Sequence, residues 1–272
     1  MLKITSRDNP RLKQARRVRD GDIKKLIFVE GLRLAEEVLR SCLQIEEAFV
    51  SENFTESERG QEFFEKYLAK KVLTAEVSDG AFNSLADTKT SQGIVLIVQK
   101  PATGKFKIEG ALQKAEQMPL VVLLHQINNP SNLGAILRTA EAVGAAGVIL
   151  TKNSADVFSP KSLRGAMGAA FRLPLWRDAN FFEAIDWARE YDLISVAADV
   201  RAEKSYLEID WNSSPRLLIF GSEAHGLSAK ELTEVDETLK IPMENNVESL
   251  NLAVSAGVIL FEAKRRLVVN GE

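Results

Sequence analysis

The sequence predicts an α/β protein built from two domains. A length of 272 residues suits two domains of ordinary size. In the second half of the chain, short apolar runs alternate with helical segments, a rhythm typical of a mostly parallel sheet covered on both faces. Between the two parts, Pro101-Ala102-Thr103-Gly104 interrupts the pattern. We therefore expect one domain over residues 1–101 and another over residues 107–272.

The first domain begins with a strongly basic segment. Residues 1–25 hold nine lysines and arginines against three aspartates, although the whole chain carries a net charge of −3. This concentration of positive charge indicates an arm that binds a polyanion. A solvated basic helix is the alternative interpretation.

The rest of the first domain is expected to alternate strands and helices. The apolar run Leu26–Val29 is typical of a strand, and Leu32–Leu43 places apolar residues at helical spacing. An amphipathic helix is expected over Gln61–Lys70. Further short strands are expected at Ala48–Val50, Val72–Leu73 and Gly93–Val98.

The second domain is expected to contain a buried central sheet. Leu120–Leu124 is continuously apolar, as central parallel strands are. The last helix is almost wholly apolar with several small residues, which predicts burial against its own domain or a second subunit. Other strands are expected at Val148–Leu150, Ile194–Ala197 and Leu217–Phe220, and helices from Ser131, around Pro160–Ala170, at Phe181–Tyr191 and from Ser249 to Arg266.

Composition excludes several classes of protein. Cys42 is the only cysteine, so no intrachain disulfide can form and a reducing compartment is expected. With His125 and His225 as the only histidines, a conventional zinc site is not expected, and we predict no bound metal. No apolar run approaches the roughly 18 residues of a membrane-spanning helix, and the N-terminus lacks a secretory signal. We expect a cytoplasmic protein with no membrane partner.

The first of three segments that carry polar groups outside the predicted core runs from Asn128 to Ala140. Pro130 precedes a helix, and Asn132 and Arg138 lie off its apolar stripe. The segment follows a strand, and ligands of open α/β sheets collect at the carboxyl ends of strands. The alternative makes Asn132 a helix N-cap and Arg138 a surface ion-pair former.

The second segment, Phe220–Leu227, follows another apolar strand. Gly221 and Gly226 flank Glu223, and glycines after a strand allow a sharp turn or a close approach to a ligand. A carboxylate within reach of Arg138 could hold its guanidinium through paired hydrogen bonds. The alternative for Glu223 is an exposed loop acid. His225 is a less favoured candidate for a general base, because a loop histidine is usually only solvated.

The third segment joins a strand to the last helix. Ile241-Pro242-Met243 is typical of a strand end, and residues 244–248 form a polar loop. Ser249 is expected to cap the helix, with Asn251 in its first turn. No Gly-x-Gly-x-x-Gly loop follows a strand, so a dinucleotide-type cofactor cradle is not supported.

The order and content of these three segments resemble the SpoU/TrmH family of RNA ribose 2'-O-methyltransferases, of the SPOUT superfamily. Residues 1–100 resemble the ribosomal-protein-L30-like (L30e-like) substrate-binding domain of the family's rRNA-modifying members. The resemblance implies an L30e-like α/β domain over residues 1–101 and an α/β-knot methyltransferase domain over residues 107–272, tied in a deep trefoil knot. It also implies S-adenosylmethionine as cofactor and a homodimer. His125 and Asn129 stand where many relatives carry Asp.

Site residues follow from the resemblance position by position. The implied catalytic residues are Asn132, Arg138, Glu223, Ser249 and Asn251. The cofactor is expected to be held, mainly by backbone, around Phe220, Gly221, Gly226, Ile241, Met243 and Leu250. The basic residues expected to bind RNA phosphates are Arg7, Arg11, Lys13, Arg16 and Arg17.

The chemistry requires a ribose 2'-hydroxyl to lose its proton as it attacks a sulfonium methyl group. We expect Arg138 to act as a cation that grips the adjacent phosphate and favours the alkoxide. The 2'-hydroxyl marks the substrate as RNA rather than DNA. The target expected from the resemblance is 23S rRNA. Methylation of tRNA, or a non-catalytic RNA-binding protein on the same scaffold, are the alternatives.

Overall fold

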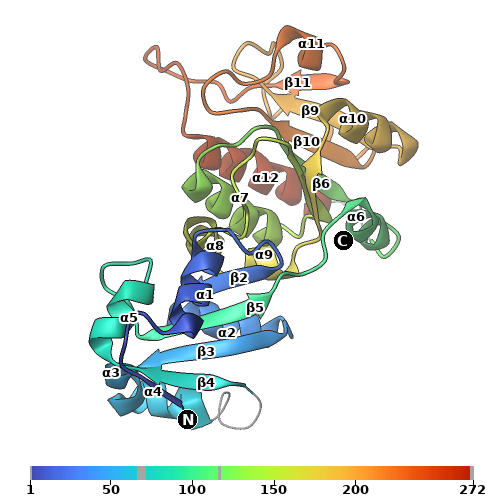
Figure 1. Ribbon diagram of the computed structural model, residues 1–272. Helices are drawn as coiled ribbons and strands as arrows, with labels where there is room; N and C mark the ends of the chain where they lie inside the picture. The colour runs from blue at the N-terminus through green and yellow to red at the C-terminus, as the bar shows by residue number, and fades with distance from the viewer. Residues whose placement is uncertain (1, 66–71, 116–117, 270–272) are drawn as a thin grey trace. The chain divides into compact units, whose positions relative to one another are not determined.

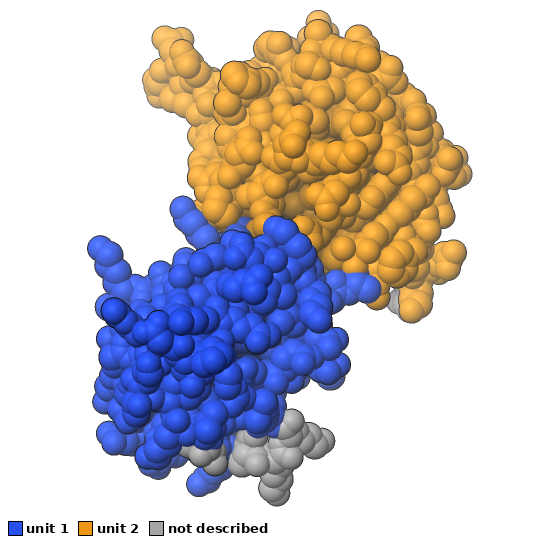
Figure 2. Space-filling model, in the orientation of Figure 1, with its two compact units in different colours: residues 1–102, 158–171 blue, residues 103–157, 172–272 orange. Residues whose placement is uncertain are grey.

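The computed structural model describes residues 2–65, 72–115 and 118–269, which form two compact units (Figures 1 and 2). One unit consists of residues 1–102 and 158–171, and the other of residues 103–157 and 172–272. The second half of the helix expected over residues 61–70 lies outside the described residues.

The first unit contains a mixed five-stranded sheet in the order β1-β4-β3-β5-β2. Neighbours β1, β4 and β3 run parallel, whereas β5 is antiparallel to both β3 and β2. The strands are β1 (Leu2–Ile4), β2 (Leu26–Glu30), β3 (Ile45–Ser51), β4 (Thr74–Val77) and β5 (Ile94–Gln99). The helices are α1 (Pro10–Arg19), α2 (Leu32–Arg40), α3 (Glu52–Glu56), α4 (Glu58–Phe63) and α5 (Asp79–Leu85), and this unit also includes α8 (Pro160–Ala166).

The basic N-terminal segment is part of the folded unit and is not an arm. Its helix α1 begins after Asn9, whose side chain accepts a hydrogen bond from the Arg11 amide. Leu12, Ala15 and Val18 of α1 are buried in the core of the unit. The alternative of a basic helix is therefore the better description, because one face of α1 is apolar at helical spacing.

The second unit contains a six-stranded sheet in the order β11-β9-β10-β6-β7-β8, in which every pair is parallel. The predicted fold class, α/β with a mostly parallel sheet in the second domain, is confirmed. The strands are β6 (Leu120–Leu124), β7 (Gly147–Thr151), β8 (Leu175–Ala179), β9 (Ile194–Ala198), β10 (Arg216–Phe220) and β11 (Glu237–Leu239). The helices are α6 (Lys105–Leu112), α7 (Pro130–Ala142), α10 (Phe181–Glu190), α11 (Ala229–Leu232) and α12 (Leu252–Val269). The short helix α9 (Ala169–Arg172) belongs to the first unit except for its last residue.

Burial explains which elements could be predicted. All five residues of β6 and of β10 are buried, and both strands appear in the sequence as apolar runs. The strand β8 was not predicted, since its sequence Leu-Trp-Arg-Asp-Ala mixes buried and exposed positions. The last strand was placed wrongly at Ile241–Met243, because the true strand, β11, is short and half polar. The strand expected at Val72–Leu73 was also wrong, since β4 begins at Thr74.

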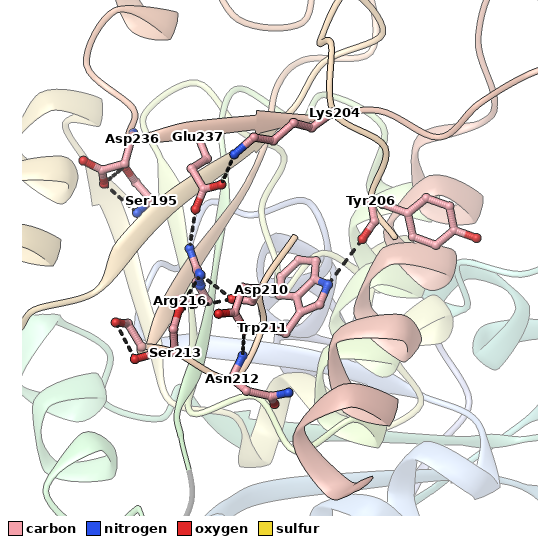
Figure 3. A network of polar contacts seen from close by, with 11 residues as sticks. Ser195, Lys204, Tyr206, Asp210, Trp211, Asn212, Ser213, Arg216, Asp236 and Glu237 are labelled. Carbon is pink, nitrogen blue, oxygen red and sulfur yellow. Dashed lines mark hydrogen bonds and ion pairs between the residues drawn. The ribbon is translucent and has the colours of Figure 1, made fainter. Parts of the chain in front are cut away.

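A polar network fastens the long connection between β9 and β10 to the sheet (Figure 3). Arg216 is 3% exposed and donates to the Glu237 carboxylate at 2.8 Å and to the backbone carbonyl of Asp210. Glu237 also forms an ion pair with Lys204 at 2.9 Å. Because a buried guanidinium requires partners, this network fixes the connection in one position.

Among the described helices, none is both long enough and apolar enough to cross a bilayer. The trefoil knot stays a prediction of the resemblance.

Candidate functional site

A cavity of about 790 Å³ lies in the second unit, where the carboxyl ends of β6, β9, β10 and β11 meet. This is the edge at which ligands of parallel sheets bind. The residues predicted from the sequence that line this cavity are Asn132, Phe220, Gly221, Glu223, Gly226, Ile241, Met243, Ser249, Leu250 and Asn251. The structure therefore brings together three segments whose predicted site residues are up to 119 positions apart in the chain.

A chain of hydrogen bonds joins the three segments at the cavity wall. The Asn251 side-chain amide donates to Asn132 Oδ1 at 3.1 Å, and Asn132 Nδ2 donates to Glu223 Oε1 at 3.2 Å. The backbone amides of Asn128 and Asn129 also donate to the Glu223 carboxylate, at 3.1 and 3.2 Å. The carboxylate thus holds the start of α7 against the turn that follows β10.

These donors also set the charge of Glu223. Burial alone would raise the pKa of this carboxyl, but the backbone amides of Glu223, Asn128 and Asn129 and the Asn132 side chain outweigh it and lower the pKa. The group is therefore an anion at neutral pH and acts as an acceptor only.

The turn after β10 requires glycine at two positions for different reasons. A Cβ on Gly221 would lie 2.4 Å from the Gly226 carbonyl carbon, so no other residue fits there. Gly226 has open space around it but a φ of +64°, which L-residues rarely adopt. The Gly226 amide closes the turn by donating to the Ser222 carbonyl at 2.9 Å.

The structure contradicts the expected pairing of Arg138 with Glu223. Arg138 is exposed, does not line the cavity and has no ion-pair partner among the residues described. It lies six residues beyond Asn132 on α7, which places it about 9 Å along the helix and roughly 240° around it. Within one chain, the side chains of Arg138 and Asn132 therefore point in different directions. The hydrogen-bond partners of Glu223 are instead amide groups of Asn128, Asn129 and Asn132.

Two helix caps also differ from expectation. The N-cap of α7 is Asn129, whose side chain accepts from the Ser131 amide at 2.9 Å, so the alternative that made Asn132 the cap is wrong. At α12 the cap is Asn251 instead of Ser249, since Asn251 Oδ1 accepts from the Ala253 amide at 2.9 Å. Both the nitrogen and the oxygen of the Asn251 side-chain amide are therefore hydrogen-bonded, to Asn132 and to the Ala253 backbone amide respectively.

His125 and His225 have different environments. His125 is 6% exposed at the end of β6, with Nε2 3.0 Å from Glu231 and Nδ1 3.2 Å from the Thr151 hydroxyl. Burial lowers the pKa of His125, although the Glu231 carboxylate works in the opposite direction. His225 is exposed and lines the cavity.

Asp199, Arg201 and Lys240 are charged residues at the cavity that were missed in the sequence. Asp199 and Arg201 follow β9 and line the cavity, where they form a bidentate pair with distances of 3.0 and 2.7 Å. The sequence offered one indication of Asp199 and Arg201, which is that they follow an apolar strand. Site residues of parallel sheets occur directly after the carboxyl ends of strands.

The basic residues of α1 divide into two groups. Arg11 pairs with Glu47 at 2.7 Å, and Arg16 donates to Ser84 and to the Arg7 carbonyl, so these two side chains hold the unit together. The side chains of Lys13 and Arg17 are more than half exposed. Arg7 is also exposed.

The chemistry of the cavity fits S-adenosylmethionine. Phe220, Leu239 and Ile259 give it an apolar floor, and polar side chains converge at its rim, the usual composition of a small-molecule site. Among the described residues, no group of three His, Cys, Asp or Glu side chains could hold a metal ion.

Comparison with known proteins identifies the family. Residues 119–261 match the SpoU rRNA methylase family, and residues 28–104 match the family of RNA 2'-O ribose methyltransferase substrate-binding domains. The chain belongs to the SpoU rRNA methylase family. The predicted family is confirmed, and the protein is an S-adenosylmethionine-dependent RNA methyltransferase.

Relatives of this SpoU methylase match over nearly its whole length. An uncharacterized tRNA/rRNA methyltransferase of Synechocystis sp. is 31% identical over 97% of this chain and 93% of its own. The 23S rRNA (guanosine-2'-O-)-methyltransferase RlmB of Coxiella burnetii is 32% identical over 90% and 97%. The AdoMet-bound rRNA methyltransferase from Sinorhizobium meliloti has a TM-score of 0.83 at 29% identity, covering 97% of this chain and 98% of that one.

Proposed function

We propose that this SpoU methylase transfers a methyl group to a ribose 2'-hydroxyl of 23S rRNA. The observation that carries the proposal is the hydrogen-bonded chain Asn251–Asn132–Glu223 at the wall of the cavity. This chain of hydrogen bonds fixes three polar side chains beside a cavity large enough for the cofactor. A protein that only binds RNA would not need such an arrangement. The proposed location is the cytoplasm.

S-adenosylmethionine supplies an electrophilic methyl group when bound. The backbone and apolar side chains around Phe220, Gly221, Gly226, Ile241, Met243 and Leu250 would hold it. Asn132, Ser249 and Asn251 would orient the ribose, since near-attack geometry lowers the barrier. Glu223 is proposed to fix the turn that presents these groups.

Arg138 is proposed to act in the cavity of a second copy of the chain. Val254, Val258 and Phe261 are 52%, 36% and 56% exposed and share one face of α12. An apolar stripe on the exposed face of a helix is typical of a subunit interface. Since α12 packs against α7, a homodimer formed through this stripe would bring Arg138 close to its partner. There the guanidinium would grip the phosphate beside the target ribose and favour the alkoxide.

RNA is proposed to bind first through the unit that contains α1. Arg7, Lys13 and Arg17 are its exposed candidates, whereas Arg11 and Arg16 are already engaged with protein partners. We propose residues 1–101 as the RNA-binding domain and residues 107–272 as the catalytic domain.

A tRNA target is the second candidate. A solved structure described by its 2'-OH methylation of C/U34 on tRNA is 31% identical, but it covers only 58% of this chain with a TM-score of 0.52. Two rRNA-named relatives, RlmB of Coxiella burnetii and RlmP of Bacillus subtilis, match 90% and 97% of the chain, which favours rRNA.

The proposal is tested by methyl transfer from labelled cofactor to total RNA, followed by mapping of the modified nucleotide. We expect label in 23S rRNA, at a 2'-O-methyl resistant to alkali. Label in tRNA alone would show that tRNA, and not 23S rRNA, is the substrate. Absence of transfer to any RNA would overturn the proposed activity.

A further inference from the structure

A charged pair at the cavity has no role in the chemistry described so far. Asp199 and Arg201 follow the carboxyl end of β9, and the Arg201 guanidinium donates twice to the Asp199 carboxylate. The Arg201 backbone amide donates to the same carboxylate at 2.7 Å. The Asp199 side chain is only 7% exposed, although it borders an open cavity. A buried carboxylate with three donors is a built feature of this wall.

The loop that carries the pair is held firmly on both sides. The Asp199 amide donates to the Leu239 carbonyl at 2.9 Å, and the Lys240 amide donates to the Lys204 carbonyl at 2.9 Å. Beyond this, Lys204 enters the network around Glu237 and Arg216 (Figure 3). The guanidinium therefore starts from a fixed backbone, which lowers the entropy lost when it binds a ligand.

The charge that this pair presents to the cavity is positive. Both oxygens of Asp199 are occupied by Arg201, and the carboxylate is almost completely covered. The Arg201 side chain is 66% exposed, and its Nη1 donates no hydrogen bond to the described residues. An oriented guanidinium with unused donors is a site for a carboxylate or a phosphate.

The position of the pair indicates which part of a ligand it meets. In the sheet, β10 lies between β9 and β6, so Arg201 and the Asn132–Glu223 wall stand on opposite sides of the Gly221 turn. A cofactor on the apolar floor would span the gap with its reacting carbon toward Asn132. Its amino-acid end would then lie toward Arg201.

We propose that Arg201, oriented by Asp199, binds the α-carboxylate of the methionine part of S-adenosylmethionine. The proposal rests on the proposed function and names the residues that recognise the only anionic group of the cofactor. Asp199 is a positioning residue in this arrangement. An RNA phosphate is the other source of an anionic oxygen at the mouth of the cavity, and the test separates the two.

The test is calorimetric binding of two nucleosides to the full-length protein without RNA. S-adenosylhomocysteine carries the α-carboxylate, whereas 5'-methylthioadenosine lacks the whole amino-acid part. We expect Arg201→Ala to weaken S-adenosylhomocysteine binding roughly 10- to 100-fold, the range for a hydrogen bond to a charged group. Binding of 5'-methylthioadenosine is expected to stay within about twofold, because its contacts do not include Arg201.

Variants of the pair and of its neighbours complete the design. Arg201→Lys should retain part of the affinity through its charge, and Asp199→Asn should weaken S-adenosylhomocysteine selectively through loss of orientation. Arg189→Ala is the matched control, since Arg189 forms exposed ion pairs with Asp186 and Glu234 away from the cavity. It should leave both affinities unchanged.

Three results would overturn the proposal. One is equal weakening of both nucleosides by Arg201→Ala, which would make the residue structural. Another is an unchanged S-adenosylhomocysteine affinity with weaker RNA binding, which would assign Arg201 to a phosphate. The third is a selective loss in Lys240→Ala instead, because Lys240 is the other cation at the cavity. If the unaltered protein binds neither nucleoside, the proposed function itself fails.

Discussion

At the scale of single residues, the site depends on amide groups that are fixed at both ends. Asn132 donates to Glu223 and accepts from Asn251, and Asn251 also caps α12. An aspartate at either position would lose the donor and place a second negative charge near Glu223. This double role explains why asparagine, a poor residue for a helix interior, stands at position 132 inside α7, whereas at position 251 it occupies an N-cap, which asparagine favours.

Glu223→Gln is expected to lower kcat/KM about 10- to 100-fold with little change in the midpoint of thermal unfolding. Glutamine keeps one acceptor oxygen, but its NH₂ group would face the amide donors of Asn128 and Asn129. Steady-state methyl transfer and a melting curve measure the two effects. Unaltered kinetics would show that the turn does not need this carboxylate.

Site residues could be predicted from the sequence where a polar residue occurs in an otherwise apolar stretch. Asn132, Glu223 and Asn251 stand out as polar groups beside apolar elements, and all three reach the cavity. Asp199 and Arg201 were missed because a charged pair in a loop has the composition of any solvated surface. The direction of Arg138 could not be predicted without the helix phase that α7 fixes.

At the scale of elements, the end of β6 is joined to its neighbours through a buried imidazole. Glu231 at α11, Thr151 at the end of β7 and Phe181 at the start of α10 all face His125. Ser228 and Glu231 form a capping box, so the imidazole also touches the segment that follows the Gly226 turn.

This environment predicts a pH dependence of stability. Burial lowers the pKa of His125 in the folded protein, so protonation of this imidazole destabilises the fold. The stability that the neutral imidazole contributes is therefore complete above about pH 6.5 and is lost as the pH falls from there through the lowered pKa. The free energy of unfolding should fall by up to about 1.4 kcal/mol per pH unit from this group. Urea unfolding of the unaltered protein and of His125→Gln at several pH values measures the difference, and parallel profiles would contradict the assignment.

The exposed stripe of α12 gives a second prediction at this scale. The double variant Val254→Asp and Phe261→Asp should be monomeric, because two buried charges without partners are incompatible with an apolar interface. Light scattering after size exclusion measures the mass. Leu73→Asp serves as control, since Leu73 is 60% exposed in the other unit. A monomeric unaltered protein, or a dimeric double variant, would argue against this interface.

The elements recovered from sequence were those with a strong period or a continuous apolar run. Strands β6 and β10 and helices α7 and α12 belong to this class. The strands β1 and β8 and the helices α5 and α6 were missed, because each is short and mixes apolar with polar residues. Their conformations are set by pairing and packing with distant segments, which a local pattern does not contain.

At the scale of the whole molecule, the proposed dimer makes each active site composite. The arginine would come from one copy and the cavity from the other, so the two parts can be inactivated separately. This arrangement would place Arg138 and Ser249 of one chain in different active sites.

Co-expression of Arg138→Ala with Ser249→Ala tests this arrangement. Each variant alone should be almost inactive, whereas mixed dimers would hold one intact site in two. With random pairing, about a quarter of the unaltered activity should return. Absence of recovery in dimers shown by differential tags to be mixed would contradict a composite active site.

The bond between Asn251 and Asn132 has a consequence for the time at which activity can arise. A ribosome making this protein releases Asn132 long before Asn251, and until the later residue emerges the wall of the cavity lacks one of its three members. The nascent chain should therefore be unable to modify the ribosomal RNA around it until Asn251 has emerged and can reach Asn132.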